Sequence, residues 1–225
     1  MGKGKVVTIV IVIVIIIWLR EQKYEKPERA RLEKDGFEVV KPSKVLERLP
    51  EGYKYIDYEY KIDGCTLSTF HRDVTSSKYE FKTKHPVYTY IMYEYKGEPL
   101  TVCPGSNKTV PYVYTTPKSV DAKWVLFDCD LIHAGSLNPN RKPRKAVQYK
   151  IAHEEDIPKL KHLEGINKRK VGDCKKTNKK KDWILRKLSL LFAYPINHIF
   201  TSHLQNRQSE FLCKLVGEER CFYNK

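Results

Sequence analysis

Residues 53–62 read YKYIDYEYKI and residues 87–95 read VYTYIMYEY, and these two stretches decide the fold class. In the first, aromatic or aliphatic residues alternate with charged ones, the period of two that is typical of a half-buried strand. Tyrosine and β-branched residues, frequent in both, favour strands over helices. Further apolar segments, separated by turn signals, lie at residues 37–40, 100–103, 123–127 and 146–151. About seven or eight short strands predict a mainly β fold, a β-sandwich or jelly roll, with α-helix confined to its periphery.

The N-terminal run of residues 6–19, VVTIVIVIVIIIWL, is apolar throughout except for one threonine. It is shorter than the about 17–25 residues of a usual spanning helix, but no small-residue cleavage site follows it. We expect residues 1–20 to be an uncleaved, single-pass membrane anchor; a cleaved signal peptide and a buried strand are the alternatives. Counting Lys and Arg on the two flanks favours a cytosolic domain. The sequon Asn107-Lys-Thr109 would favour the lumen if it were used, so the sidedness stays open.

The remaining boundaries follow shifts in composition. We expect a charged stalk with N-terminal helices at 21–52, the β core at 53–155, and a basic segment with C-terminal helices at 156–225. The chain has a net charge of +15, and residues 159–187 are rich in Lys and Arg. Such a run is typical of a solvated loop, of a surface that binds anionic lipid, or of non-specific nucleic-acid binding.

The six cysteines form no CxxC pair and show no zinc-like spacing. Cys129 lies in an apolar segment, where a buried, unreactive thiol is expected. The sequence therefore does not indicate a redox compartment.

Three side chains have the types and order of a metal site. His71 and Asp73 are two residues apart, so on a strand they would project from one face, and His133 follows a later apolar segment. Two imidazoles and one carboxylate are the ligands of non-haem Fe(II) oxygenases. Taken alone the His-x-Asp pair could equally be an ordinary surface hydrogen bond. Arg144 begins the next strand, where its guanidinium could bind a dicarboxylate through two parallel hydrogen bonds.

From residue 69 to 149 the chain resembles the Fe(II)- and 2-oxoglutarate-dependent dioxygenases, within them the phytanoyl-CoA dioxygenase-like group. The motifs that carry the resemblance are His71-Arg-Asp73, GEPLTVCPGS at 97–106, VLFD at 125–128, and HAGSLN at 133–138 followed by Arg144. The resemblance implies a double-stranded β-helix, with O2 as a co-substrate. It assigns His71, Asp73 and His133 to iron, and Arg144 and Ser136 to 2-oxoglutarate. Asn107 stands where the family often has histidine.

The expected function is a membrane-anchored dioxygenase that hydroxylates a lipid, a protein side chain or a small metabolite. One alternative is a non-catalytic jelly-roll protein with a basic tail that binds anionic lipid or nucleic acid. Another is a cupin-like metal enzyme that does not need Arg144, and a third is nucleic-acid demethylation. The other five histidines show no paired spacing and are expected at surface or structural positions: residues 85, 153, 162, 198 and 203.

Overall fold

The computed structural model describes residues 22–65, 70–95, 100–108, 116–135 and 143–172, together with Cys174, Lys181 and Ile184. The predicted membrane anchor lies outside these residues, and so do the predicted C-terminal helices apart from Ile184. Within the described part of the chain, no helix is both long and apolar enough to cross a membrane.

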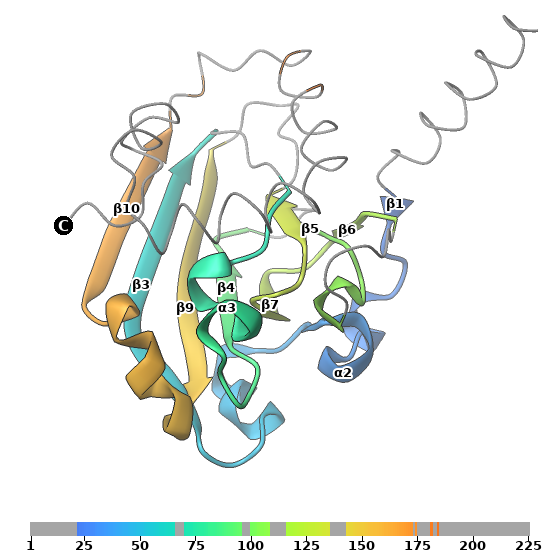
Figure 1. Cartoon of the computed structure of the whole chain (residues 1–225). Helices are drawn as coiled ribbons and strands as arrows, with labels where there is room; N and C mark the ends of the chain where they lie inside the picture. Colours follow the sequence, from blue (N-terminus) through green and yellow to red (C-terminus); the bar gives the residue numbers. More distant parts are fainter. Residues whose placement is uncertain are drawn as a thin grey trace, which may run out of the picture.

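The described strands form two sheets, drawn in Figure 1. The larger has the order β10-β3-β9-β4-β7-β2 and the smaller the order β1-β6-β5-β8. The strands are β1 (Gln22–Lys23), β2 (Phe37–Glu38), β3 (Tyr53–Gly64), β4 (Tyr88–Tyr93), β5 (Leu100–Val102), β6 (Lys118–Val120), β7 (Trp124–Asp128), β8 (His133–Gly135), β9 (Arg144–His153) and β10 (Ile166–Gly172). The prediction of a mainly β fold is confirmed.

Helical segments are short and join the strands. The α-helices are α2 (Leu32–Asp35) and α3 (Lys78–Phe81), and the 3-10 helices are η1 (Pro27–Arg29), η2 (Pro42–Lys44), η3 (Leu46–Arg48), η4 (Val74–Ser76), η5 (Ser106–Lys108) and η6 (Glu154–Leu163). α3 begins after Ser77, whose hydroxyl accepts hydrogen bonds from two backbone N–H groups of the first turn. Such caps satisfy donors that a helix start leaves unpaired.

The two sheets pack face to face over one apolar core. On β4 the alternation of side chains predicts that Thr89 and Ile91 share one face and that Tyr90 lies on the other. Ile91 packs in a buried cluster with residues of both sheets: Tyr93, Leu100, Val102, Val120, Val125 and Phe127. Tyr90 belongs to a different cluster on the opposite face. The Thr89 side of β4 therefore faces the space between the sheets.

Residues 22–52 belong to the segment 21–52 that was predicted as a stalk with N-terminal helices, and they contribute strands to both sheets. α2 ends at Gly36, whose φ of 79° lies in the left-handed region that favours glycine. β2 then pairs antiparallel with β7, Phe37 opposite Phe127, and β1 pairs in parallel with β6. Side chains of this segment cover the outer face of the larger sheet: Leu32, Val40, Val45 and Leu49. The segment is part of the packed domain.

The beginning of the basic segment is also built into the domain. β10 pairs in parallel with β3 at the edge of the larger sheet, where a loop was one expectation. β9 runs antiparallel to β3, and after β9 the chain turns back through η6. β10 therefore runs in the same direction as β3. At the far end of the pair, a Cβ on Gly64 would lie 2.4 Å from the backbone nitrogen of Gly172. The beginning of the basic segment therefore packs against the core.

A disulfide between Cys65 and Cys174 closes the same end of the β3–β10 pair. The two residues are 109 positions apart in the sequence. Cross-links that close long loops restrict the unfolded chain most. The bond thus joins the residue that follows β3 to the region just after β10.

Removing this disulfide is expected to lower the free energy of unfolding by about 2–4 kcal/mol. Cys174→Ala should then reduce Tm by roughly 5–15 °C in a chain of this size. Thermal unfolding followed by circular dichroism measures the effect. Because a single variant already breaks the bond, Cys65→Ala/Cys174→Ala should melt close to Cys174→Ala. Additive losses would show that the cysteines act independently.

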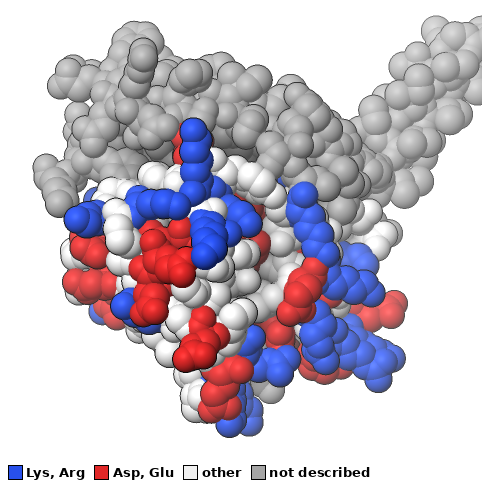
Figure 2. Space-filling model, turned by 60° about the horizontal axis from the view of Figure 1, so that its bottom comes forward, with Lys and Arg blue, Asp and Glu red and all other residues white. Residues whose placement is uncertain are grey.

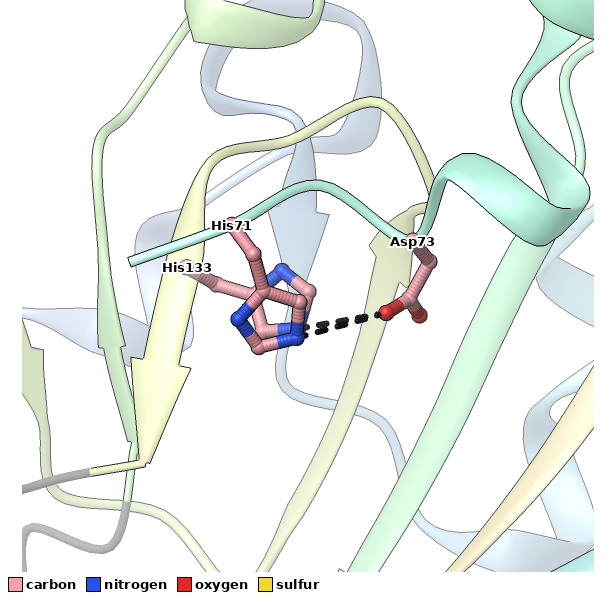
Figure 3. Close-up of side chains that lie close together, drawn as sticks. All are labelled: His71, Asp73 and His133. Carbon is pink, nitrogen blue, oxygen red and sulfur yellow. Dashed lines mark ion pairs between the residues drawn. The ribbon is translucent and has the colours of Figure 1, made fainter. Parts of the chain in front are cut away.

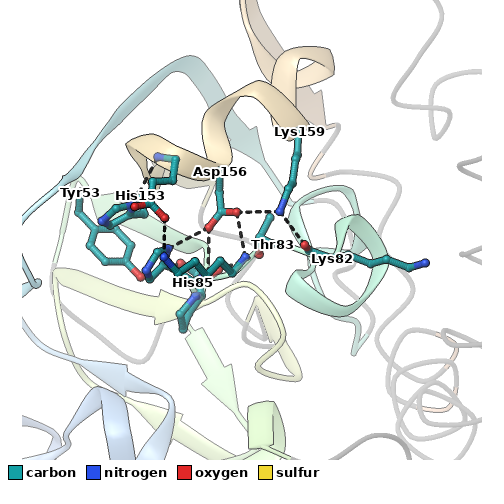
Figure 4. Close-up of polar contacts among 10 residues, drawn as sticks. Tyr53, Lys82, Thr83, His85, His153, Asp156 and Lys159 are labelled. Atoms are coloured by element: carbon teal, nitrogen blue, oxygen red, sulfur yellow. Dashed lines mark hydrogen bonds and ion pairs between the residues drawn. The ribbon is translucent and has the colours of Figure 1, made fainter.

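Two histidines that appear scattered in the sequence meet where β9 joins η6 (Figure 4). The rings of His85 and His153 stack with centroids 3.9 Å apart. Asp156, fully buried, accepts from the backbone N–H of His85 at 2.8 Å and lies 3.1 Å from its ring Nδ1. His153 Nδ1 accepts from the backbone N–H of Glu155 at 3.3 Å, and the Glu155 carboxylate pairs with Lys84 at 2.8 Å. His85, His153 and Glu155 could together hold a metal ion, but their protein partners favour a structural role.

Candidate metal centre

His71 and His133 lie directly opposite each other on neighbouring extended segments. The backbone N–H of each donates to the carbonyl of the other at 2.9 Å, which makes one antiparallel bridge. Side chains of a directly opposed pair project to the same side, and the two ring centroids are 4.5 Å apart. His133 opens β8, whereas the strand predicted around His71 is reduced to this bridge among the described residues.

Asp73 completes the group, as Figure 3 shows. Its Oδ1 lies 3.7 Å from His71 Nε2 and 3.6 Å from His133 Nε2. Donor atoms that share one first-row metal ion at right angles are about 3 Å apart, given metal–ligand distances of about 2.1 Å. Small side-chain movements would close the difference. One ligand atom from each of the three residues therefore converges, and the group could hold a metal ion.

The ring of His133 is fixed in the orientation that a metal ligand needs. Its Nδ1 lies 2.9 Å from the carbonyl oxygen of Leu131, which can only accept, so Nδ1 carries the proton. Burial lowers the pKa of His133 to about 4, against the opposing effect of Asp73. The imidazole is therefore neutral at pH 7, with the Nε2 lone pair turned toward Asp73. This pattern of one bound and one available nitrogen is typical of metal-ligating histidines.

The second oxygen of Asp73 has its own partners. Oδ2 accepts from Lys150 Nζ at 2.6 Å and from Thr89 Oγ1 at 2.6 Å. Burial raises the pKa of Asp73, but Lys150 and the two histidines outweigh it and lower that pKa below its usual range. Burial acts in the opposite direction on Lys150, where Asp73 outweighs it and raises the pKa. Asp73 is thus ionised and Lys150 charged.

The thiol of Cys129 lies beside this ion pair, 3.3 Å from Thr89 Oγ1 and 3.5 Å from Lys150 Nζ. It is fully buried, as the sequence predicted. Burial raises the pKa of Cys129 to about 12. The thiol is therefore protonated and unreactive at neutral pH.

Arg144, predicted as the co-substrate ligand, lies over Gly135 of β8, the strand that carries His133. A Cβ on Gly135 would lie 1.4 Å from Arg144 Nη1, so the guanidinium fills the space of a side chain at position 135. Positions 133 and 135 of a strand share a face, about 7 Å apart. The guanidinium, which is largely buried, is thus on the same face as His133.

The loop at residues 103–108 supports the two segments that carry His71 and His133. Ser106 Oγ accepts from the backbone N–H of Ile132, and Ser106 O accepts from Arg72 Nη2, both at 2.8 Å. Asn107 Nδ2 donates to Asp128 Oδ2 at 2.9 Å. A glycan on Asn107 would attach to this nitrogen, which already makes that contact. The Pro-Gly-Ser loop is therefore a structural support for the site.

A buried carboxyl behind α3 holds the segment after Asp73. Asp130 accepts hydrogen bonds from the Ser77 hydroxyl and from the backbone N–H of Lys78, the latter at 2.9 Å. Burial raises the pKa of Asp130 to about 6, and the neighbouring charge of Asp128 adds to the effect. This carboxyl joins α3 to the residues that precede His133.

Comparisons with known proteins give no sequence match: no protein-family model fits the chain, and no curated protein matches it. Several solved structures are similar at low identity. EvdMO1 has 15% identity and a TM-score of 0.38 over 47% of this chain and 28% of its own. The epimerase SnoN, in complex with Fe3+, alpha-ketoglutarate and nogalamycin RO, has 12% and 0.32 over 40% and 43%. The non-heme monooxygenase ThoJ has 12% and 0.39 over 73% of each chain.

This chain therefore spans less than half the length of EvdMO1 and of SnoN in that complex. All three TM-scores are below 0.5.

The structure brings together four of the five predicted site residues: His71, Asp73, His133 and Arg144. Ser136 lies outside the described residues, as does Arg141, the other candidate for the dicarboxylate. Sequence reasoning missed Lys150 and Thr89. The sequence held one signal that Lys150 faces the site. It lies an even number of residues from Arg144 on β9, and therefore on the same face of the strand, and two apolar residues follow it. A lysine at such a position is either exposed or paired, and only the fold decides which.

Proposed function

We propose that this protein is an Fe(II)- and 2-oxoglutarate-dependent dioxygenase of the phytanoyl-CoA dioxygenase-like group, with a double-stranded β-helix core. The observation that carries the proposal is the convergence of His71 Nε2, His133 Nε2 and Asp73 Oδ1. Two imidazole nitrogens and one carboxylate are the donor set of non-haem Fe(II) oxygenases. The buried Arg144 guanidinium on the same face supports a dicarboxylate co-substrate.

Each residue has a distinct task in this proposal. His71, Asp73 and His133 would hold the iron and leave its other face open. Arg144 would bind the distal carboxylate of 2-oxoglutarate through two parallel hydrogen bonds, with Ser136 as a second contact. When bound, iron and 2-oxoglutarate supply the oxidation: O2 is consumed, 2-oxoglutarate becomes succinate and CO2, and one oxygen atom enters the substrate.

The Arg144 guanidinium supports a dianionic co-substrate. Asp73 and Lys150 neutralise each other at 2.6 Å. Arg144 adds a positive charge that is only 8% exposed. A buried cation attracts an anion more strongly than an exposed one because solvent screens it less. The substrate itself, a lipid, a protein side chain or a small metabolite, is left open.

Anaerobic titration of the full-length, metal-free protein with Fe(II) and then 2-oxoglutarate tests the proposal. We expect a charge-transfer absorption band in the visible range that grows with 2-oxoglutarate and saturates at one equivalent per site. Glutarate, which lacks the keto group, is the matched control and should produce no band. A protein that binds neither iron nor 2-oxoglutarate would instead be the non-catalytic jelly-roll protein.

The location of the enzyme is part of the proposal. We propose that residues 6–19 anchor it in a membrane and that the domain faces an oxidising compartment. The Cys65–Cys174 disulfide supports this orientation, because such bonds persist mainly outside the cytosol. It outweighs the Lys and Arg count, which favours the cytosol. Protease protection of the domain in sealed vesicles tests the orientation; digestion without detergent in vesicles with the cytosolic side out would contradict it.

The basic segment contributes little unpaired charge where the structure describes it. Lys159 donates to Asp156 at 3.1 Å, and Arg169 pairs with Asp63. On the face in Figure 2, basic and acidic side chains of the described residues lie side by side. Binding to an anionic lipid or nucleic-acid surface is therefore proposed for the lysines from 175 onward.

A further inference from the structure

We propose that Lys150 and Thr89 are positioning residues that hold the Asp73 carboxylate so that only Oδ1 is presented to the metal. The inference rests on the proposed function for the nature of the bound group. It concerns residues to which neither the motifs nor the comparisons give a role.

The three side chains form a closed triangle of hydrogen bonds. Lys150 Nζ and Thr89 Oγ1 each lie 2.6 Å from Asp73 Oδ2, and they lie 2.7 Å from each other. Lys150 is 2% exposed and Thr89 is fully buried. Both donors therefore approach the same oxygen, in a place that water reaches poorly.

The position of Lys150 distinguishes two roles: orienting the Asp73 carboxylate, or occupying the place of the metal ion. Its ammonium group binds Oδ2, whereas the two histidines face Oδ1. The cation therefore satisfies one oxygen of Asp73 without entering the space between the three ligand atoms. A lysine that replaced the metal would bind the oxygen that the histidines share.

A buried ion pair is not expected at this position if its only effect is on the stability of the fold. Burying two charges costs several kcal/mol per ion, and well-packed apolar side chains are often at least as stable. Partners of a metal-bound carboxylate, in contrast, orient it and tune its affinity. Because Oδ2 is held by Lys150 and Thr89, the carboxylate cannot turn to offer both oxygens to the metal. A second bound oxygen would block a position on the metal that the co-substrate needs.

Strand β9 contributes to both halves of the site, the metal ligands and the proposed co-substrate contact. Arg144 and Lys150 are six residues apart on β9, and residues an even number apart project from the same face. β4 supplies Thr89 next to Lys150, because Thr89 pairs with Lys150 in the sheet. The larger sheet thus fixes Asp73 from behind, while β8 presents His133 from the other sheet.

Thr89→Val is the decisive variant because it removes the hydroxyl donor while keeping the branched shape and the charge of the site. Co(II) is the probe, titrated into metal-free, full-length protein without 2-oxoglutarate. We expect Thr89→Val to weaken Co(II) binding by about 10- to 100-fold, the usual effect of losing a partner of a metal ligand. Thr89→Ser, which restores the hydroxyl, should recover most of the affinity. Binding measured with His71→Ala serves as the background.

Lys150→Met removes a charge as well as a hydrogen bond, and these two changes act on Co(II) affinity in opposite directions. Its readout is therefore the visible absorption spectrum of bound Co(II), which reports the number and type of ligands. We expect a changed spectrum in Lys150→Met and in Thr89→Val, and a wild-type spectrum in Thr89→Ser.

If Lys150 and Thr89 contribute only to the stability of the fold, their replacement should leave Co(II) binding and the Co(II) spectrum unchanged. Folded Thr89→Val with wild-type Co(II) affinity and spectrum would overturn the inference, whatever its Tm. An unchanged spectrum in folded Lys150→Met would overturn it as well. Because 2-oxoglutarate is absent from these titrations, a failure here leaves the Fe(II)/2-oxoglutarate band of the wild-type protein as a separate result.

Discussion

Replacing His71 by alanine is expected to abolish substrate-independent conversion of 2-oxoglutarate to succinate, with a loss of about 100-fold or more. Losing a partner of a metal ligand already costs about 10- to 100-fold, and a direct ligand should cost at least as much. The side chain is 41% exposed, so the fold should survive its removal. Succinate release with Fe(II), ascorbate and O2 measures the effect.

His153→Asn is the matched control. It removes an imidazole at the end of β9, outside the proposed metal site. The asparagine side chain still offers an acceptor for the backbone N–H of Glu155, which donates to His153 in the wild type. This variant should retain wild-type succinate formation. If His153→Asn were inactive and His71→Ala active, the metal would instead be held by the other histidine group.

Asp73→Ala should also eliminate succinate formation, but it is a less direct test. It leaves the fully buried Lys150 without the carboxylate it pairs with at 2.6 Å. Removing one partner of a buried ion pair costs about 3–5 kcal/mol. Inactive Asp73→Ala protein must therefore be shown to be folded, whereas His71→Ala carries no such penalty.

Gly135→Ala is expected to raise the KM for 2-oxoglutarate although it removes no functional group. The new Cβ would lie 1.4 Å from Arg144 Nη1, so the guanidinium must move away from the site. Arg144→Ala should show the full loss, about 10- to 100-fold, because a hydrogen bond to a charged group contributes about 1.5–3 kcal/mol. Steady-state kinetics with varied 2-oxoglutarate measures both variants.

Arg144→Lys separates charge from geometry. Lysine keeps the positive charge but not the planar fork that matches a carboxylate, so its KM should lie between those of the wild type and Arg144→Ala. Unchanged kinetics in Arg144→Ala would favour a cupin-like metal enzyme that uses no dicarboxylate.

Most of the larger sheet could be predicted from local pattern. The alternation at residues 53–62 and 87–95 corresponds to β3 and β4, and the apolar segments at 123–127 and 146–151 correspond to β7 and β9. Each signal is contained in five to ten residues, which is the length of a strand. β10 escaped prediction because its sequence, INKRKVG, is charged. As an edge strand with mostly exposed side chains, it requires no apolar face.

The disulfide and the position of residues 22–52 could not be derived in the same way. Cys65 and Cys174 are 109 residues apart, and spacing gives no connectivity among six cysteines. The N-terminal segment is charged overall, and the few apolar residues that bury it against the outer face of the larger sheet form no periodic pattern. Both are products of contacts between distant parts of the chain.

The sequence by itself determined the residue types of the site, because His71, Asp73, His133 and Arg144 form a chemically specific set in a specific order. Only the tertiary structure decided how they work together. It brought His71 opposite His133 in a single bridge, and it placed the Arg144 guanidinium over Gly135. It also turned Lys150 inward onto the rear oxygen of Asp73. The physical reason is that local pattern fixes which face a side chain occupies, whereas convergence and charge pairing depend on which faces the packed sheets bring together.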